Sequence, residues 1–171
     1  CESLPERAEQ SEFRLPADRV FTLKGFGTIV TGTLMEGKLK KGQEAVLYPE
    51  NIPVKVRSIQ VHGVPRDTAY AGERAALNIP DKKKEEISRG DILALKDSMY
   101  PSYMLDIRAE ALKHAGRKIE NGSRVHVYHG TRELLGKIIL MDREELNPGE
   151  SCYAQLRLEE ITAAKKWDRC V

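Results

Sequence analysis

Two arginines and an aspartate stand at the ends of apolar segments and could together bind an anion. Asp18 and Arg19 directly precede the apolar segment Val20–Leu23, and Arg74 opens the segment Ala75–Ile79. A carboxylate that pairs with a guanidinium group orients it, and the guanidinium group offers several N–H donors to an anionic ligand. We therefore expect these three side chains to bind a negatively charged group, provided that one end of the fold gathers them.

Two further polar side chains, Gln60 and His62, end the apolar segment that begins at Val56. Each polar residue at a strand end is, by itself, typical of an ordinary surface residue. Their significance depends on whether the fold brings them to the same place as the two arginines.

Several motifs with known chemistry are incomplete in this chain. Gly25-Phe26-Gly27 begins like a dinucleotide-binding loop, but Val30 occupies the third glycine position and strand residues follow where a helix would be needed. No P-loop is present in the sequence. The glycines therefore predict a tight turn between two strands and do not predict a phosphate-binding loop.

The histidines and paired carboxylates do not predict a catalytic or metal site. His126 and His129 are three residues apart in an expected strand, so their side chains point to opposite faces. Glu144 and Glu145 precede a Pro-Gly turn, which favours a solvated turn over a catalytic pair. No serine or cysteine stands at a recognisable spacing from a histidine. From its own chemistry, the sequence predicts no enzyme and no metal site.

Short β-branched segments separated by turn residues dominate the chain and predict an all-β fold of two consecutive small β-barrels. Gly32 is expected to bend the chain into a third segment, Gly37–Gly42 to form a turn, and residues 53–62 to form one strand with a bulge. The expected strands are 20–24, 27–35, 43–48, 53–62, 73–79, 91–95, 103–111, 123–129, 133–142 and 151–159. The expected domains are a linker over 1–12, a barrel over 13–97 and a barrel over 98–171.

The bulk composition is that of an ordinary globular chain. Its 171 residues are 40% hydrophobic and 32% charged, and the net charge is +2, which does not indicate a histone-type nucleic-acid binder. No apolar run reaches the length of a membrane span, so we expect no membrane association. The widely spaced Cys1, Cys152 and Cys170 predict free thiols. Because the chain does not begin with methionine and ends within an expected strand, we expect a piece of a longer protein.

Four segments together resemble the second domain of translational GTPases of the elongation factor Tu class. They are VFTLKGFGTIVTGTL (20–34), GKLKKGQE (37–44), AGERAALNI (71–79) and ISRGDIL (87–93). Within that class, the segment FRLPADRVFTLKGFGTIVTGTL (13–34) and residues 129–171 are most similar to the selenocysteine-specific elongation factors. The resemblance covers nearly the whole chain beyond the linker.

This resemblance implies a role in delivering selenocysteinyl-tRNA to the ribosome at recoded UGA codons in the cytoplasm. The fragment itself is expected to have no catalytic activity and no cofactor. GTP and Mg²⁺ are expected in a GTPase domain before Cys1, and a domain that binds the selenoprotein mRNA hairpin is expected after Val171. The implied partners of the whole protein are therefore selenocysteinyl-tRNA, the ribosome and the mRNA hairpin.

The resemblance also assigns roles to site residues. General elongation factors carry two acidic residues where this chain has Asp18 and Arg19, and an asparagine where it has Arg74. Both changes add a positive charge beside the aminoacyl group, which implies a pocket for an ionised selenol. The terminal adenosine pocket is implied at Leu23, Gly25, Ile29, Gln60 and His62. Gln60 replaces a glutamate that contacts the terminal ribose, so it is expected to bond the 2′-hydroxyl.

Three alternatives remain open from the sequence. The barrels of another translational GTPase, either a general elongation factor or an initiation-factor γ subunit, share the motifs but not the charges at Arg19 and Arg74. A subunit of a GTPase-coupled sulfate adenylyltransferase belongs to a different functional class. A purely structural spacer would not bind tRNA at all.

Overall fold

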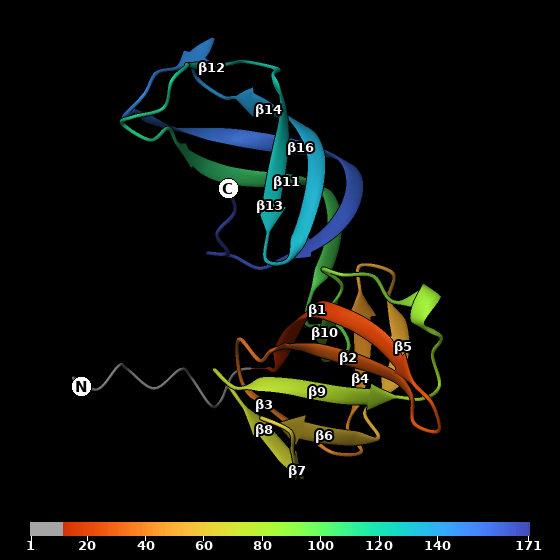
Figure 1. Ribbon diagram of the computed structural model, residues 1–171. Helices are drawn as coiled ribbons and strands as arrows, with labels where there is room; N and C mark the ends of the chain where they lie inside the picture. Colours follow the sequence, from red (N-terminus) through yellow and green to blue (C-terminus); the bar gives the residue numbers. More distant parts are fainter. Residues whose placement is uncertain (1–11) are drawn as a thin grey trace, which may run out of the picture. The chain divides into compact units, whose positions relative to one another are not determined.

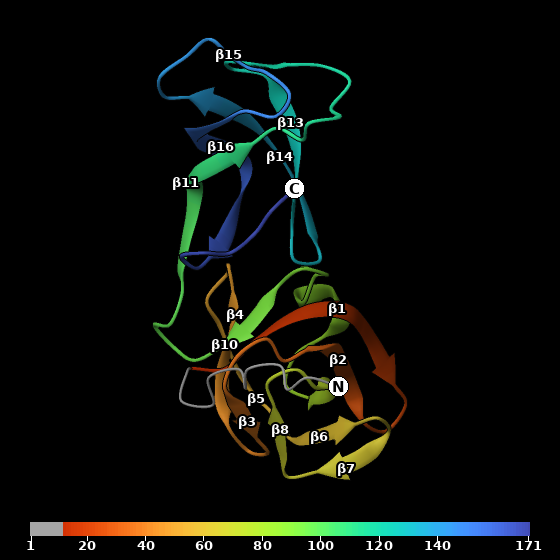
Figure 2. The ribbon, with the colours of Figure 1, turned by 90° about the vertical axis from the view of Figure 1, so that its left-hand side faces the viewer.

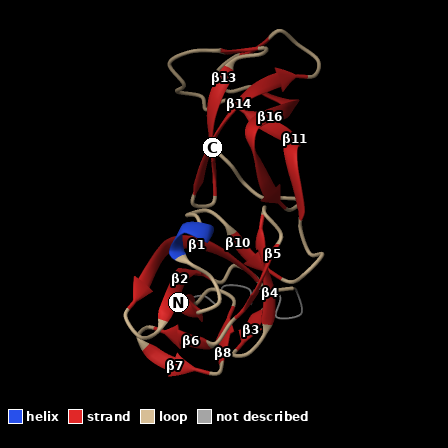
Figure 3. Ribbon diagram, turned by 90° about the vertical axis from the view of Figure 1, so that its right-hand side faces the viewer, coloured by secondary structure: helices blue, strands red, loops and turns tan. Residues whose placement is uncertain are grey.

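The structure is a computed structural model that describes residues 12–171 and consists almost entirely of β-strands (Figures 1 and 3). This confirms the all-β class. The chain forms two compact units. Unit 1 contains the described residues up to Pro101 with Gly130–Arg132 and Ala163–Lys166, and unit 2 contains Ser102–His129, Glu133–Thr162 and Trp167–Val171. The expected linker lies outside the described residues except for Glu12, and the expected domain ranges remain a prediction.

Unit 1 is built around an eight-stranded sheet with the order β5-β4-β10-β1-β2-β9-β6-β7, beside which β3 pairs with β8 (Figure 2). Every described pair of neighbouring strands is antiparallel. The strands are β1 (Arg14–Leu23), β2 (Gly27–Thr33), β3 (Lys38–Lys40), β4 (Glu44–Tyr48), β5 (Ile52–Lys55), β6 (Ser58–Val61), β7 (Val64–Arg66), β8 (Thr68–Tyr70), β9 (Arg74–Ile79) and β10 (Ile92–Ala94). One 3₁₀ turn, η1 (Lys84–Glu86), lies between β9 and β10 in a segment of charged residues.

Alternating apolar side chains from these strands close over one core. The inward positions of β2, β9 and β6 are Val30, Leu77 and Ile59, which lie in register with one another and are almost fully buried. Because side chains alternate along a strand, the residues between them face outward. The same pattern that builds the core therefore also creates an outer sheet face over β1, β2, β9 and β6.

Two expected elements differ from the structure. Residues 53–62 form two strands, because β5 pairs with β4 whereas β6 pairs with β9. The change in alternation that predicted a bulge is therefore a strand break at Val56 and Arg57. Gly37–Gly42 is more than a turn, since Lys38–Lys40 pairs with β8 before the chain turns at Lys41.

Gly32 does not bend the chain away from β2, as the sequence suggested, but lies within it opposite Ala17 and Ala75. A Cβ atom at Gly32 would overlap the carbonyl oxygen of Pro16 and would lie 2.7 Å from Cδ2 of Leu15. Glycine is required here because β1 crosses very close to β2, and not because of an unusual backbone conformation.

Unit 2 contains a four-stranded sheet with the order β11-β16-β14-β13 and a separate pair, β12 with β15. Its strands are β11 (Tyr100–Glu110), β12 (Ile119–Glu120), β13 (Arg124–His129), β14 (Arg132–Leu140), β15 (Glu145–Leu146) and β16 (Ser151–Ala164). Near the chain end, Tyr128 and Val171 exchange two backbone hydrogen bonds, 2.7 and 3.0 Å long, so a short segment pairs with β13 where a further strand was expected.

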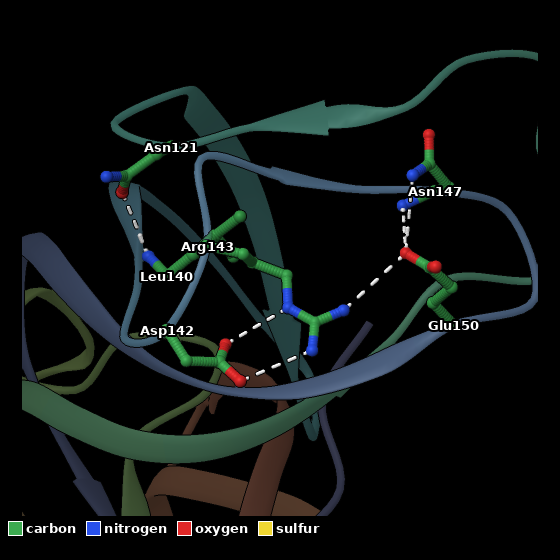
Figure 4. Close-up of polar contacts among 6 residues, drawn as sticks. All are labelled: Asn121, Leu140, Asp142, Arg143, Asn147 and Glu150. Atoms are coloured by element: carbon green, nitrogen blue, oxygen red, sulfur yellow. Dashed lines mark hydrogen bonds and ion pairs between the residues drawn. The ribbon is translucent and has the colours of Figure 1, made fainter.

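Ion pairs and caps hold the turns of unit 2 (Figure 4). Arg143 bridges the carboxylates of Asp142 and Glu150, and Glu150 also accepts the backbone N–H of Asn147 at 3.0 Å. The hydrogen bond from Arg143 lowers the pKa of Asp142. This network fixes the Asn147-Pro148-Gly149 turn, and Asn121 similarly accepts the backbone N–H of Leu140. These contacts are structural in character.

Cys152 and Cys170 are free thiols, as the sequence predicts, whereas Cys1 lies outside the described residues. Burial raises the pKa of both thiols. Within residues 12–171, no helix combines the length and the apolar character that a membrane crossing would need.

We expect Gly32→Ala to lower the free energy of unfolding by about 1–3 kcal/mol, because the added methyl group must displace the backbone of β1. Gly116→Ala is the matched control, since a Cβ atom there meets nothing within 4 Å. Chemical denaturation followed by circular dichroism measures both. Equal stabilities of the two variants would contradict the close approach of β1 to β2.

Candidate functional site

A β-bulge in β1 brings Asp18 and Arg19 to the same side of the sheet. Ala17 pairs with Gly32 and Arg19 pairs with Thr31, so Asp18 is an extra residue without a partner of its own on β2. Ala17 is buried in the core, whereas Arg19 is exposed. Without the bulge, strict alternation would turn Arg19 into the core, where an unpaired charge is costly.

Asp18 connects the bulge to β9 across β2. Its Oδ1 atom accepts a hydrogen bond of 2.6 Å from the hydroxyl of Thr31, and its Oδ2 atom forms an ion pair with Nη1 of Arg74. The Asp18 side chain is only 19% exposed, whereas that of Arg74 is 50% exposed. The structure thus places the predicted carboxylate and one predicted arginine in contact.

Arg19 differs from Arg74 in its charge environment. Within the described part of the chain, the structure gives Arg19 no ion pair, while Arg74 is neutralised by Asp18. Arg19 lies on β1 and Arg74 on β9, the two strands that flank β2. At the usual strand spacing, these two strands are about 10 Å apart. The cluster therefore contains one compensated and one uncompensated guanidinium group on the same face.

A row of four residues in register crosses the outer face. Arg19 pairs with Thr31, Thr31 with Ala76, and Ala76 with Gln60. Residues directly opposite one another in an antiparallel sheet point to the same side, so Gln60 lies on the face that carries Arg19. The long side chains of Arg19 and Gln60 stand at the two ends of this row, with short side chains between them.

The end of the face near the β1–β2 turn is apolar. Leu23 and Phe21 on β1 and Ile29 on β2 are on its outer side, where Leu23 is 47% and Phe21 is 36% exposed. Gly25 lies in the turn with φ +85°, and a Cβ atom there would meet nothing within 4 Å. This end can accept a flat apolar group close to the backbone.

The structure does not bring all five residues predicted for the terminal adenosine together. Leu23, Gly25 and Ile29 gather near the β1–β2 turn, and Gln60 lies in the central row. His62 lies beyond Val61, which pairs with Ala75, so it is level with Arg74 at the charged end. His62 is exposed and has φ +52° in the turn between β6 and β7.

Three residues of this face were missed by sequence reasoning. Thr31 holds Asp18, Phe21 adds an exposed aromatic ring, and Asn78 donates a hydrogen bond of 2.6 Å to the carbonyl oxygen of Phe26 in the turn. The period-2 alternation from Ile29 to Thr31 and from Phe21 to Leu23 could have found two of them. Nothing local in the sequence connects Asn78 to Phe26, 52 residues away.

The described residues contain no group of three or more side chains arranged to hold a metal ion. His126 contacts Glu133 at 2.8 Å and His129 contacts Asp168 at 3.0 Å, so each histidine has its own carboxylate partner. The outer face combines exposed apolar residues at one end with two arginines at the other, an arrangement that can accept a group with an apolar end and an anionic end.

Comparisons with known proteins agree with the resemblance that the sequence motifs carry. Residues 27–94 match the family described as Elongation factor Tu domain 2. The chain is 40% identical over 159 residues to the selenocysteine-specific elongation factor of Desulfomicrobium baculatum, covering 93% of this chain and 25% of that protein. It is 39% identical over 142 residues to that of Escherichia coli (strain K12), covering 81% of this chain and 22% of that protein.

A solved structure shows the same architecture. The crystal structure of the bacterial selenocysteine-specific elongation factor EF-Sec matches 99% of this chain and 27% of that chain, with a TM-score of 0.83 and 29% identity. The similarity to selenocysteine-specific elongation factors and the fold of translation-factor β-barrels are thereby confirmed. The chain spans about a quarter of the length of these relatives.

We expect Thr31→Val to lower the free energy of unfolding by about 1–2 kcal/mol, because the largely buried Asp18 carboxylate loses a hydrogen bond. Thr33→Val is the matched control, since Thr33 is the next outward residue on β2 and is exposed. Urea denaturation of both variants measures the difference. An equal loss in the two variants would show that the hydroxyl of Thr31 has no special role at the bulge.

Proposed function

We propose that this chain is the part of a selenocysteine-specific elongation factor that binds the aminoacylated 3′ end of selenocysteinyl-tRNA. The observation that supports this most strongly is the cluster of Asp18, Arg19 and Arg74 on one outer face, where Arg19 has no ion pair with any residue of 12–171. The similarity to selenocysteine-specific elongation factors over most of the chain points to the same ligand.

The charge on the ligand explains why this cluster would favour selenocysteine. A selenol is largely ionised near neutral pH, whereas the hydroxyl of serine is neutral. Arg19 would donate hydrogen bonds to the selenolate, and such charge-assisted bonds are stronger than neutral ones. Because a seryl group offers no negative charge, the same arginine would contribute little to its binding.

The Asp18–Arg74 pair would serve a different purpose from Arg19. With its charge compensated by Asp18, Arg74 adds N–H donors near the ligand without adding a second full positive charge. The hydroxyl of Thr31 donates a hydrogen bond to the Asp18 carboxylate, which helps to hold that carboxylate in its ion pair with Arg74. The site is thereby arranged before binding, which lowers the ordering cost of association.

The remainder of the face would hold the terminal adenosine. Leu23 and Phe21 offer an exposed apolar surface for the base beside the open backbone at Gly25, and Ile29, which pairs with Phe21 but is only 8% exposed, would support that surface. Gln60 can bond a ribose hydroxyl. His62 is level with Arg74, so we assign it to the aminoacyl end of the site.

The activity of the whole protein would require parts other than this chain. GTP and Mg²⁺ would bind in a GTPase domain, and the selenoprotein mRNA hairpin would bind another domain. This chain would act without catalysis, by holding the aminoacylated end while the whole factor brings selenocysteinyl-tRNA to the ribosome in the cytoplasm.

We expect Arg19→Ala in the full-length protein to weaken selenocysteinyl-tRNA binding by about 10- to 100-fold, the equivalent of one charged hydrogen bond, and to change seryl-tRNA affinity less than about threefold. Arg74→Ala should cost at least as much, because it also leaves the Asp18 carboxylate unpaired beside the selenolate. Equilibrium binding of the GTP-bound factor to each tRNA measures both effects.

Arg89→Ala provides the control, since it removes an exposed arginine of unit 1 that lies outside this face. It should leave both affinities unchanged. Equal losses for selenocysteinyl-tRNA and seryl-tRNA in the Arg19 variant would refute recognition of the selenolate.

A further inference from the structure

A second candidate site lies elsewhere on unit 1. A groove of about 850 Å³ is lined by Lys40, Lys41, Gly42, Lys55, Arg57, Asp67, Thr68, Pro80 and Asp81. None of these residues belongs to the face that carries Asp18 and Arg19. A second hollow of about 460 Å³ shares Lys40, Lys41 and Gly42 and extends the basic surface to Lys38.

The groove has an excess of positive charge that its own residues do not neutralise. Lys41 lies 3.9 Å from Asp67, but both side chains are mostly exposed, so that pair is weak and screened by salt. For Lys40, Lys55 and Arg57, the described part of the chain provides no ion pair within 4.0 Å. Three cations are therefore available to an anionic ligand.

The backbone under these cations is held firmly. Lys40 pairs with Thr68, and the N–H groups of Lys41 and Arg57 donate to the carbonyl oxygens of Asp67 and Asn78 at 2.8 and 2.9 Å. Lys55 ends β5 at its pairing with β4. The charges stand on paired strands and tight turns, so their spacing is set by the fold.

The residue types of the groove favour one kind of ligand. None of the nine lining residues is aromatic, so the groove lacks the stacking surfaces on which single-stranded bases are held. Asp67, Asp81 and Thr68 can accept hydrogen bonds from 2′-hydroxyl groups, which RNA has and DNA lacks. Lysine and arginine contacts to phosphates, with acceptors for sugar hydroxyls, suit the backbone of an RNA duplex.

We propose that this groove binds the phosphodiester backbone of a double-stranded segment of RNA, independently of the aminoacyl site. The binding depends on shape and charge and not on base sequence. It gives the chain a second contact to RNA that does not require an aminoacyl group.

The test measures the binding of the 171-residue chain to a fluorescent RNA duplex of about 16 base pairs, by anisotropy between about 50 and 200 mM salt. The combined variant Lys40→Ala, Lys55→Ala and Arg57→Ala should reduce the slope of log affinity against log salt by about 2–3, since each lost phosphate contact lowers it by about 0.9.

The matched control combines Lys83→Ala, Lys84→Ala and Arg89→Ala, which removes the same residue types from exposed positions of unit 1 outside the groove. For this control, the slope of log affinity against log salt should differ from that of the unchanged chain by less than about one. An equal reduction in both variants would show that binding follows total charge and would overturn the proposal. Unchanged circular dichroism spectra establish that both variants are folded.

Two further measurements address the ligand. A DNA duplex of the same sequence should bind more weakly than the RNA duplex, and combining Asp67→Ala with Asp81→Ala should abolish that preference. Equal affinity of the unchanged chain for RNA and DNA would overturn the assignment to RNA.

A competition experiment identifies which RNA the groove binds. The fluorescent duplex should be displaced by tRNA without an aminoacyl group, or by small ribosomal subunits instead. Displacement by neither would overturn a role for the groove with these RNAs.

Discussion

The close crossing of β1 over β2 at Gly32 is the constraint on which the outer face depends. The space beside Gly32 is filled by Leu15 and the Pro16 carbonyl, so β1 can pass only where β2 has no side chain. Directly beyond this crossing, β1 changes its partner from β10 to β2 and contains the bulge at Asp18. The bulge shifts the alternation by one residue, and this shift directs Arg19 outward.

The electrostatic arrangement of the outer face follows from this one-residue shift in the alternation of side chains. Asp18 reaches across β2 to Arg74 because the extra residue has no backbone partner of its own. Its hydrogen bond with Thr31 joins the bulge to β2. A carboxylate that is only 19% exposed requires such partners. Asp18 thereby compensates the charge of Arg74, whereas Arg19 has no ion pair within residues 12–171. The contrast between a neutralised and a free arginine is thus a consequence of backbone geometry.

The barrel of unit 1 presents two surfaces of different chemistry on different strands. The outer face of β1, β2, β9 and β6 combines apolar residues with a compact charge cluster, which suits one specific end group. The groove beside β3, β5 and β8 combines dispersed cations with hydroxyl and carboxylate acceptors, which suits an extended backbone. Pro80 and Asp81 border the groove directly after β9, so both surfaces depend on the position of that strand.

Local sequence patterns are sufficient to predict the all-β class, most strands of both units, the turn at Gly25 and the residue types that could bind an anion. These features are local, since alternation and turn residues act over a few positions. Other features depend on how distant segments pack together: residues 53–62 divide between two partner strands, Gly32 is a crossing point, and His62 lies level with Arg74. The tertiary structure also determines that Asn78 supports the β1–β2 turn, and that Asp18 pairs with Arg74 while Arg19 has no ion pair within the described residues. The physical reason is that strand order and register arise from contacts between distant segments, and a shift of one residue in register reverses the face on which every later side chain lies.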